Sequence, residues 1–345
     1  MFPIRTDSYP VWDHNRLHRR IRTGRLILRN LIWVSPKIQP ERRYTSQGHP
    51  YDLYEPPKPH HSTLLMIYGF TLAGEKEPRL IRFAKAFTAA GFRVVVPDLP
   101  GLKSLDLRKG DLERLIDMMA FLHRELEGSV GVVGFSVGGG IALTAAVNPS
   151  LQGFADPILL FGPHYSLPDL WSSLRRNKES FPKTKEGWDN FIWLQLMLAY
   201  RQRKALGFNA AEQFELVELL KTYCSKPSLG DKRRAYERLV QPHGLLDTQG
   251  EVVDLDVLES LSPRGKLGKL TAQVLLLHDS FDPLIPPSQS QFMLTELQQR
   301  GIPHQERLVI TPLLSHVNPR AVLNLPDLLA ILDMIGELFT HSNKV

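Results

Sequence analysis

Residues 130–147 read VGVVGFSVGGGIALTAAV. The first six are small or apolar and predict a buried strand, and the residues from Val137 onward are rich in Gly and Ala and predict a helix packed closely against it. Gly134 to Gly138 between them form the pattern G-x-S-x-G, in which a sharp turn presents a serine while the glycines leave room for neighbouring backbone. Ser136 is therefore the candidate nucleophile, and a purely structural turn is the alternative.

Strand and helix patterns alternate on both sides of this stretch, which predicts an α/β fold with a mostly parallel central sheet and helices on both faces. Between 165 and 265 no short apolar strand occurs and the pattern is helical, so we expect an inserted unit. The predicted organisation is a basic N-terminal arm (1–43), a first core segment (44–164), a helical cap or lid (165–265) and a second core segment (266–345).

In this order of elements, residues 44–340 resemble the α/β-hydrolase family, including its nucleophile turn. The resemblance implies a triad in the chain order Ser, Asp, His, with the acid after the strand that follows the cap and the histidine after the last strand. Asp282, in DSFDPLIP (279–286), and His316, in LSH (314–316), occupy those positions. Asp279 is the competing acid, and Asp282 is preferred because it directly precedes the PLIP that opens the next helix.

The same resemblance implies an oxyanion hole made of two backbone N–H groups, those of Val137 and Phe70. Many family members begin the second loop with His-Gly, whereas this chain has YGFT (68–71). Gly69 keeps the close backbone approach, but Thr71 stays open as an alternative to Phe70.

The sequence predicts neither a metal nor a cofactor, because it has no HExxH, CxxC or carboxylate cluster and GGG after Ser136 lacks dinucleotide-binding spacing. Cys224, the single cysteine, excludes an internal disulfide and is interpreted as an ordinary helix residue. His164 follows a predicted strand at 157–161 and is interpreted as a structural or substrate-contacting residue.

The positive charge is concentrated at the N-terminus. Residues 1–43 hold ten Lys or Arg and three Asp or Glu, a net +7, so the rest of the chain carries −1 and a nucleic-acid groove is not expected. Leu17, Ile21 and Leu28 recur at roughly helical spacing beside arginines, which suits either weak contact with an anionic membrane surface or packing onto the catalytic body. A secretory signal and a bilayer-spanning stretch are not apparent, so a cytoplasmic location, with peripheral membrane contact as a variant, is the expectation.

These residue types predict a serine hydrolase that cleaves a carboxylic ester through an acyl-enzyme. An acyltransferase would use the same triad, and a non-catalytic binding protein with this fold is the third hypothesis. Bulky apolar residues in the cap, concentrated between Trp188 and Tyr200, predict an apolar channel and a small-molecule ester with an apolar acyl or alkyl part.

Overall fold

The computed structural model describes residues 37–57, 62–126, 130–176, 185–223, 228–244, 254–282, 284–302, 306–316, 318–319 and 324–341. Most of the basic arm (1–36) and Cys224 lie outside these residues, so the expectations about them stay predictions.

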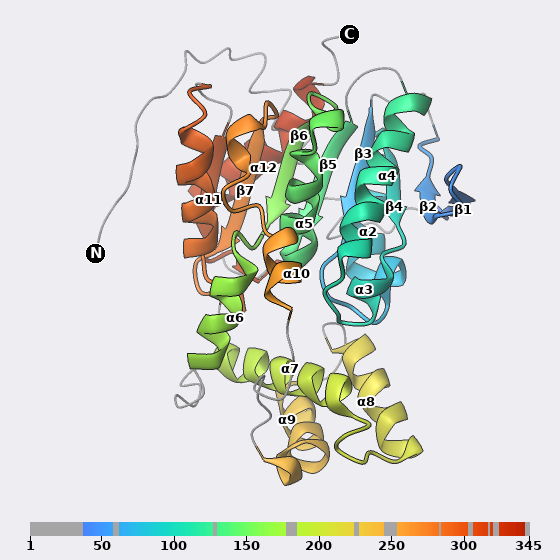
Figure 1. The fold of residues 1–345 in the computed structure, drawn as a ribbon, viewed down its shortest axis with the longest axis vertical. Helices are drawn as coiled ribbons and strands as arrows, with labels where there is room; N and C mark the ends of the chain where they lie inside the picture. The colour runs from blue at the N-terminus through green and yellow to red at the C-terminus, as the bar shows by residue number, and fades with distance from the viewer. Residues whose placement is uncertain are drawn as a thin grey trace.

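The centre of the molecule is an eight-stranded sheet in the order β1-β2-β4-β3-β5-β6-β7-β8 (Figure 1). Its strands are β1 (Glu41–Tyr44), β2 (Pro50–Tyr54), β3 (Thr63–Ile67), β4 (Arg93–Pro97), β5 (Val130–Phe135), β6 (Ala155–Phe161), β7 (Val274–Asp279) and β8 (Glu306–Thr311). The β1–β2 and β2–β4 pairs are antiparallel and all other pairs are parallel. Every residue of β3, β5 and β7 is buried, as continuous apolar runs require in a sheet covered on both faces. The predicted α/β architecture is confirmed.

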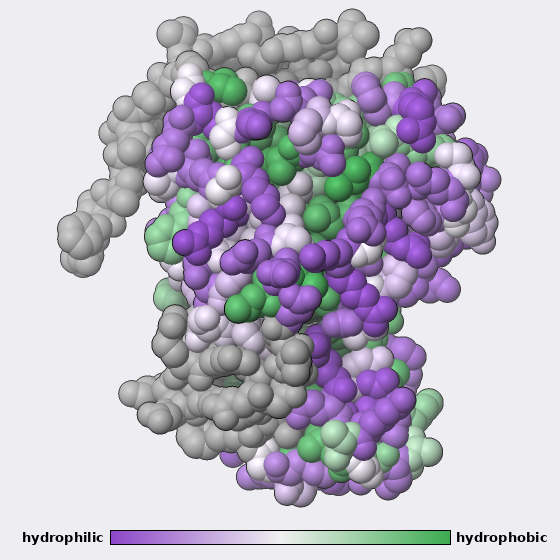
Figure 2. Space-filling view, viewed as in Figure 1, coloured by the Kyte–Doolittle hydropathy of each residue, from purple (hydrophilic) through white to green (hydrophobic). Residues whose placement is uncertain are grey.

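Helices cover both faces of the sheet, with α5 on the near face in Figure 1 and α12 behind. The helices of the core are α2 (Pro78–Ala89), α3 (Pro100–Lys103), α4 (Lys109–Glu125), α5 (Ser136–Ala146), α11 (Ser288–Gln298) and α12 (Leu325–His341). The face seen in Figure 2 is mostly hydrophilic, in keeping with the burial of the apolar runs in the interior.

A second group of helices lies at one end of the sheet. It consists of α6 (Leu167–Arg176), α7 (Lys185–Gln202), α8 (Ala210–Thr222), α9 (Leu229–Leu239) and α10 (Leu255–Ser260), all within the interval 165–265, and we call it the cap. Helices α7, α8 and α9 share a second apolar cluster with Leu105 of the core, whereas Leu170 of α6 and Leu258 of α10 belong to the main cluster of the sheet. The members of the second cluster from α7, α8 and α9 include Ile192, Leu196, Leu216 and Tyr236. Capping boxes begin α8 at Asn209 and α9 at Ser228.

The N-terminal boundary of the core differs from the one drawn from the sequence. Strand β1 begins at Glu41, and Arg42 forms ion pairs with Asp52 (2.7 Å) and Asp98 (3.2 Å). Residues 41–43, assigned to the basic arm by their charge, therefore belong to the sheet. Within the described part of the chain, no helix combines the length and apolarity needed to cross a membrane.

Parallel pairing brings distant loops to one edge of the sheet. Ile67 of β3 pairs with Gly134 of β5, Phe135 with Phe161 of β6, and Asp279 of β7 with Thr311 of β8. The loops that follow β3, β5, β7 and β8 consequently emerge side by side, which is where parallel α/β sheets bind ligands.

Candidate active site

Ser136 lies at the junction of β5 and α5 with a backbone φ of +54°. A non-glycine residue adopts this left-handed conformation only where its surroundings hold it, and such strain concentrates at functional sites. Small neighbours are needed for the turn to fit, since a Cβ at Gly138 would lie 1.9 Å from the carbonyl oxygen of Tyr68. The structure thus places Ser136 on a strained strand-to-helix turn of the kind that presents a nucleophile.

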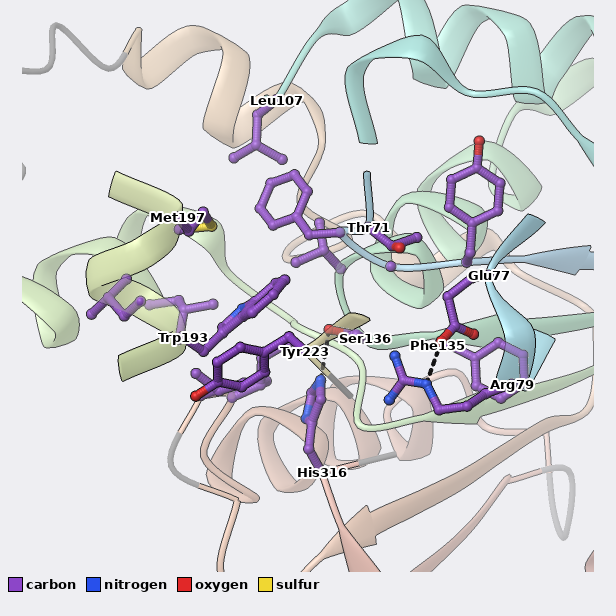
Figure 3. Close-up of a pocket in the computed structure, with 18 of the residues that line it drawn as sticks. Thr71, Glu77, Arg79, Leu107, Phe135, Ser136, Trp193, Met197, Tyr223 and His316 are labelled. Carbon is purple, nitrogen blue, oxygen red and sulfur yellow. Dashed lines mark hydrogen bonds and ion pairs between the residues drawn. The ribbon is translucent and has the colours of Figure 1, made fainter. Parts of the chain in front are cut away.

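His316 comes to Ser136 from 180 residues further along the chain, after the short strand β9 (Leu314–Ser315), which pairs with β10 (Asn318–Pro319). Its Nε2 is 2.8 Å from the Ser136 Oγ, and its Nδ1 is hydrogen-bonded to Oδ2 of Asp282. A carboxylate can only accept, so the Nδ1 atom carries the proton and Nε2 is left as the acceptor for the serine hydroxyl. This tautomer allows the imidazole to act as a general base (Figure 3).

Asp282 is buried and its carboxylate is held from several sides. Oδ1 accepts the backbone N–H groups of Leu284 and Ile285, both at 3.0 Å. Burial by itself raises the pKa of this carboxyl, but the electrostatic interaction with His316, the nearby His278, and hydrogen bonds from His316 and the Ile285 N–H outweigh it, so the pKa lies well below its ordinary value. Asp282 therefore stays ionised beside His316.

Asp279, the competing acid, lies in a different place. Its Oδ2 accepts the backbone N–H of His316 at 2.9 Å and its Oδ1 accepts that of Phe281 at 3.0 Å. The imidazole ring of His316 bonds to Asp282. Of the two candidate acids, Asp282 is therefore the one in position to orient the ring.

His278 was assigned no role from the sequence. It is fully buried, and its Nε2 lies 2.7 Å from the carbonyl oxygen of Ile285 and 3.6 Å from Oδ2 of Asp282. Because a carbonyl only accepts, Nε2 carries the proton, and Nδ1 then accepts from the Ser290 hydroxyl at 2.7 Å. The available signal was a polar residue directly after the apolar run VLLL at the edge of the sheet.

The loop after β3 passes directly over Ser136. A Cβ at Gly69 would lie 2.8 Å from the Cβ of Ser136, so only glycine allows this approach. The Thr71 N–H donates to the carbonyl oxygen of Leu102 at 3.3 Å, which favours Phe70 as the donor from this loop. Val137 lies in the first turn of α5, where backbone N–H groups have no acceptor within the helix. Phe70 and Val137 both line the same cavity as Ser136.

This cavity, of about 250 Å³, has one wall from the core and one from the cap. Figure 3 shows Ser136 and His316 between Arg79 and Phe135 on one side and Trp193 and Tyr223 on the other. The lining is mainly apolar and includes Leu80, Phe83, Leu107, Leu167, Leu170, Trp171, Leu194, Met197, Leu258, Leu284 and Ile285. Its charged members are Glu77 and Arg79, which pair with each other at 2.5 Å, and Lys232, whose Nζ lies 3.9 Å from the Tyr223 ring centre.

His164 lies in the connection between β6 and α6 and does not line the cavity. Its fully buried ring would be 2.3 Å from a Cβ at Gly140, and its Nε2 lies 3.1 Å from the carbonyl oxygen of Leu261. Burial lowers the pKa of His164 to about 4, despite this hydrogen bond. The sequence left a structural and a substrate-contacting role open for His164, and its contacts are those of a structural residue.

No group of three or more His, Cys, Asp or Glu side chains is arranged to hold a metal ion among the described residues. The imidazoles and carboxylates at the site instead bond to one another and to backbone.

Comparison with known proteins gives one family match: the model of the alpha/beta hydrolase family matches residues 72–325. A search of curated proteins gives no match to this sequence. Similar solved structures include an esterase from Pyrobaculum calidifontis, at 14% identity over 97% of this chain and 96% of that one with a TM-score of 0.48. A dienelactone hydrolase from Anabaena variabilis ATCC 29413 has 18% identity over 89% of this chain and 99% of that one, with a TM-score of 0.46.

A Pyrococcus horikoshii acylaminoacyl peptidase has 12% identity over 80% of this chain, with a TM-score of 0.44. The chain spans only 37% of that peptidase, and 38% of an acylaminoacyl peptidase in complex with a chloromethyl ketone.

Proposed function

The chain belongs to the alpha/beta hydrolase family, and we propose that within it this protein hydrolyses carboxylic esters through an acyl-enzyme on Ser136. The observation that carries the proposal is the continuous hydrogen-bonded chain from the Ser136 hydroxyl through His316 to the buried Asp282, at the wall of a mainly apolar cavity.

The proposed mechanism begins with proton transfer from the Ser136 hydroxyl to Nε2 of His316 as Oγ attacks the ester carbonyl carbon. Asp282 stabilises the imidazolium that forms, which is consistent with its lowered pKa. The oxyanion of the tetrahedral intermediate accepts hydrogen bonds from the N–H groups of Phe70 and Val137. His316 then gives its proton to the leaving alcohol, and water activated by the same imidazole releases the acid.

Esters with an apolar acyl or alkyl part are the proposed substrate class. Trp171, Trp193 and Met197 contribute apolar surface to the cavity, and burial of each added methylene contributes about 0.8 kcal/mol until the space is full. We therefore expect kcat/KM to rise from acetate to longer acyl chains.

The proposal is tested by fluorophosphonate labelling and by turnover of nitrophenyl acetate, butyrate, octanoate and palmitate. Wild-type protein should be labelled on Ser136 and release acid, and Ser136→Ala should lose both, with a fall in kcat of about 10⁵-fold or more. Unlabelled wild-type protein without turnover would point to a binding protein. A transferred ester formed in preference to free acid, when an alcohol is added, would indicate an acyltransferase.

A further inference from the structure

Asp279 joins the two loops that carry the acid and the histidine. It is the last residue of β7 and 1% exposed. One carboxylate oxygen accepts the N–H of Phe281, within the acid loop, and the other accepts the N–H of His316, 37 residues away. Asp279 is also paired with Thr311 at the end of β8, so the carboxylate is fixed to the sheet from which the histidine loop leaves.

The group that Asp279 holds is in a strained conformation. His316 has a φ of +56°, and in the described part of the chain only Leu105 and Ser136 share a positive φ among non-glycine residues. L-residues keep this conformation only where their contacts determine it. The bond from the His316 N–H to Asp279 is such a contact, and it fixes the backbone from which the ring reaches Ser136 and Asp282.

We propose that Asp279 is a positioning residue that holds the backbone of His316 in its left-handed conformation, while Asp282 holds the ring. This inference rests on the proposed function, because it assigns Asp279 to the same reaction. The two carboxylates, three residues apart, thus have different roles: Asp282 orients the imidazole ring of His316, and Asp279 orients its backbone.

Asp279 is not among the residues that line the cavity. It therefore acts through His316 and has no direct contact with substrate. Its loss should lower kcat and leave KM nearly unchanged, because a small displacement of a general base is costly to the reaction while the substrate-binding walls stay in place.

The experiment compares Asp279→Ala and Asp279→Asn with Ser280→Ala. Ser280 is the next residue of the loop, and its buried hydroxyl has no hydrogen-bond partner among the described residues, so it is a matched control. We expect Asp279→Ala to lower kcat by about 10- to 100-fold with KM within about twofold of wild type. Asp279→Asn, which keeps one of the two acceptor oxygens, should lose less, and Ser280→Ala should keep wild-type kcat.

Folding is checked by circular dichroism and thermal unfolding. If Asp279→Ala does not fold, the kcat and KM of Asp279→Asn are compared with those of Ser280→Ala instead. A folded Asp279 variant with wild-type kcat, or with a raised KM at unchanged kcat, overturns the proposal. An equal loss in Ser280→Ala overturns it too, because the loop as a whole would then be responsible.

A readout without substrate separates this inference from the proposed function. Proton NMR should show a low-field Nδ1–H signal of His316 in wild type and Ser280→Ala, and its loss or broadening in Asp279→Ala. If the protein hydrolyses no ester but this signal responds to Asp279, the proposed function fails and the positioning role stands. If ester turnover depends on Ser136 but neither kcat nor the signal responds to Asp279, the positioning role alone fails.

Discussion

The sheet and the cap are two apolar assemblies built in different ways. In β3, β5 and β7 every side chain is buried, because helices cover both faces of the sheet. In the cap, α9 buries only Lys232, Tyr236 and Leu239 of its eleven residues, and α7, α8 and α9 meet around a small cluster of their own. The sheet is a deeply buried support, whereas the cap is a smaller group of helices with its own apolar cluster.

The candidate site is divided along the same line. Ser136, Asp282 and His316 all come from loops at the edge of the sheet, where register sets their spacing. Trp193 and Met197 of the cap contribute cavity wall and no member of the hydrogen-bonded chain, and they also pack in or against the apolar cluster of the cap. Changes in the core should therefore impair the chemistry, and changes in the cap should alter which ester is preferred.

After loss of the Ser136 hydroxyl, the largest expected effect is that of Asp282→Asn. The amide cannot hold His316 in the required tautomer or stabilise the imidazolium, so kcat should fall by about 10³- to 10⁴-fold with the fold intact. Steady-state kinetics with a short nitrophenyl ester measures this fall. If Asp282→Asn kept a near-normal rate, Asp282 would not be the acid. The expectation that changes in the core impair the chemistry would then be contradicted at its central residue.

A comparison of Gly138→Ala with Gly110→Ala tests the close packing beneath the nucleophile. A Cβ at Gly138 would lie 1.9 Å from the backbone of Tyr68. We therefore expect Gly138→Ala to lower the free energy of unfolding by about 3 kcal/mol and to lose activity. Nothing lies within 4 Å of the Cβ position at Gly110 in α4, and alanine there should be neutral or stabilise by up to about 1 kcal/mol. Urea denaturation of both variants checks this, and equal stabilities would contradict the packing argument.

His164, in the connection between β6 and α6, should make the stability of the protein depend on pH. Its pKa is lowered to about 4, so between pH 6.5 and 4 the unfolded chain binds a proton that the folded chain does not. Stability should therefore fall as the pH drops through this window, by about 3 kcal/mol in total from this group. His164→Gln keeps an N–H donor for the Leu261 carbonyl oxygen but has no titrating group. Its free energy of unfolding should therefore fall by about 3 kcal/mol less than that of wild type over the same pH range. Urea denaturation at pH 7 and pH 4 decides, and parallel declines in both proteins would exclude His164 as the cause.

The smallest expected effect belongs to the cap. Trp193→Ala removes part of the cavity wall and should lower kcat/KM for an octanoate ester by about 10-fold while changing that for acetate by less than about threefold. Phe214→Ala on α8 is the control, because Phe214 is 69% exposed and does not line the cavity. An equal loss on both esters after Trp193→Ala would show that the cap takes part in the chemistry.

Much of the core could be predicted because its signals are short-ranged. Buried strands appear as uninterrupted apolar runs such as TLLMI in β3, and helix ends are marked by residues such as Gly91. The boundary after residue 43 failed for a related reason: β1 has the exposed, charged sequence ERRY, and its place in the sheet comes from pairing with β2 and from the ion pairs of Arg42.

The cap was harder to predict, because an amphipathic helix does not indicate which of its apolar residues face which neighbour. In the segment predicted to form a channel, Trp193, Leu194 and Met197 line the cavity while also packing in or against the cluster of the cap, whereas Ile192, Leu196 and Leu198 belong to that cluster and do not line the cavity. All six carry the same apolar signal in the sequence. The difference arises from how α7 is rotated against the sheet edge and against α8 and α9.

The sequence by itself determined the strand–turn–helix at residues 130–147 and with it the position of Ser136, because apolar runs and small residues act on backbone only a few positions away. Only the tertiary structure decided that Asp282 bonds to the ring of His316 while Asp279 bonds to its backbone, and that His278 supports the acid loop. Those assignments depend on the direction of side chains that meet at the ends of parallel strands, between residues as far apart as 37 positions, and no local pattern encodes that direction.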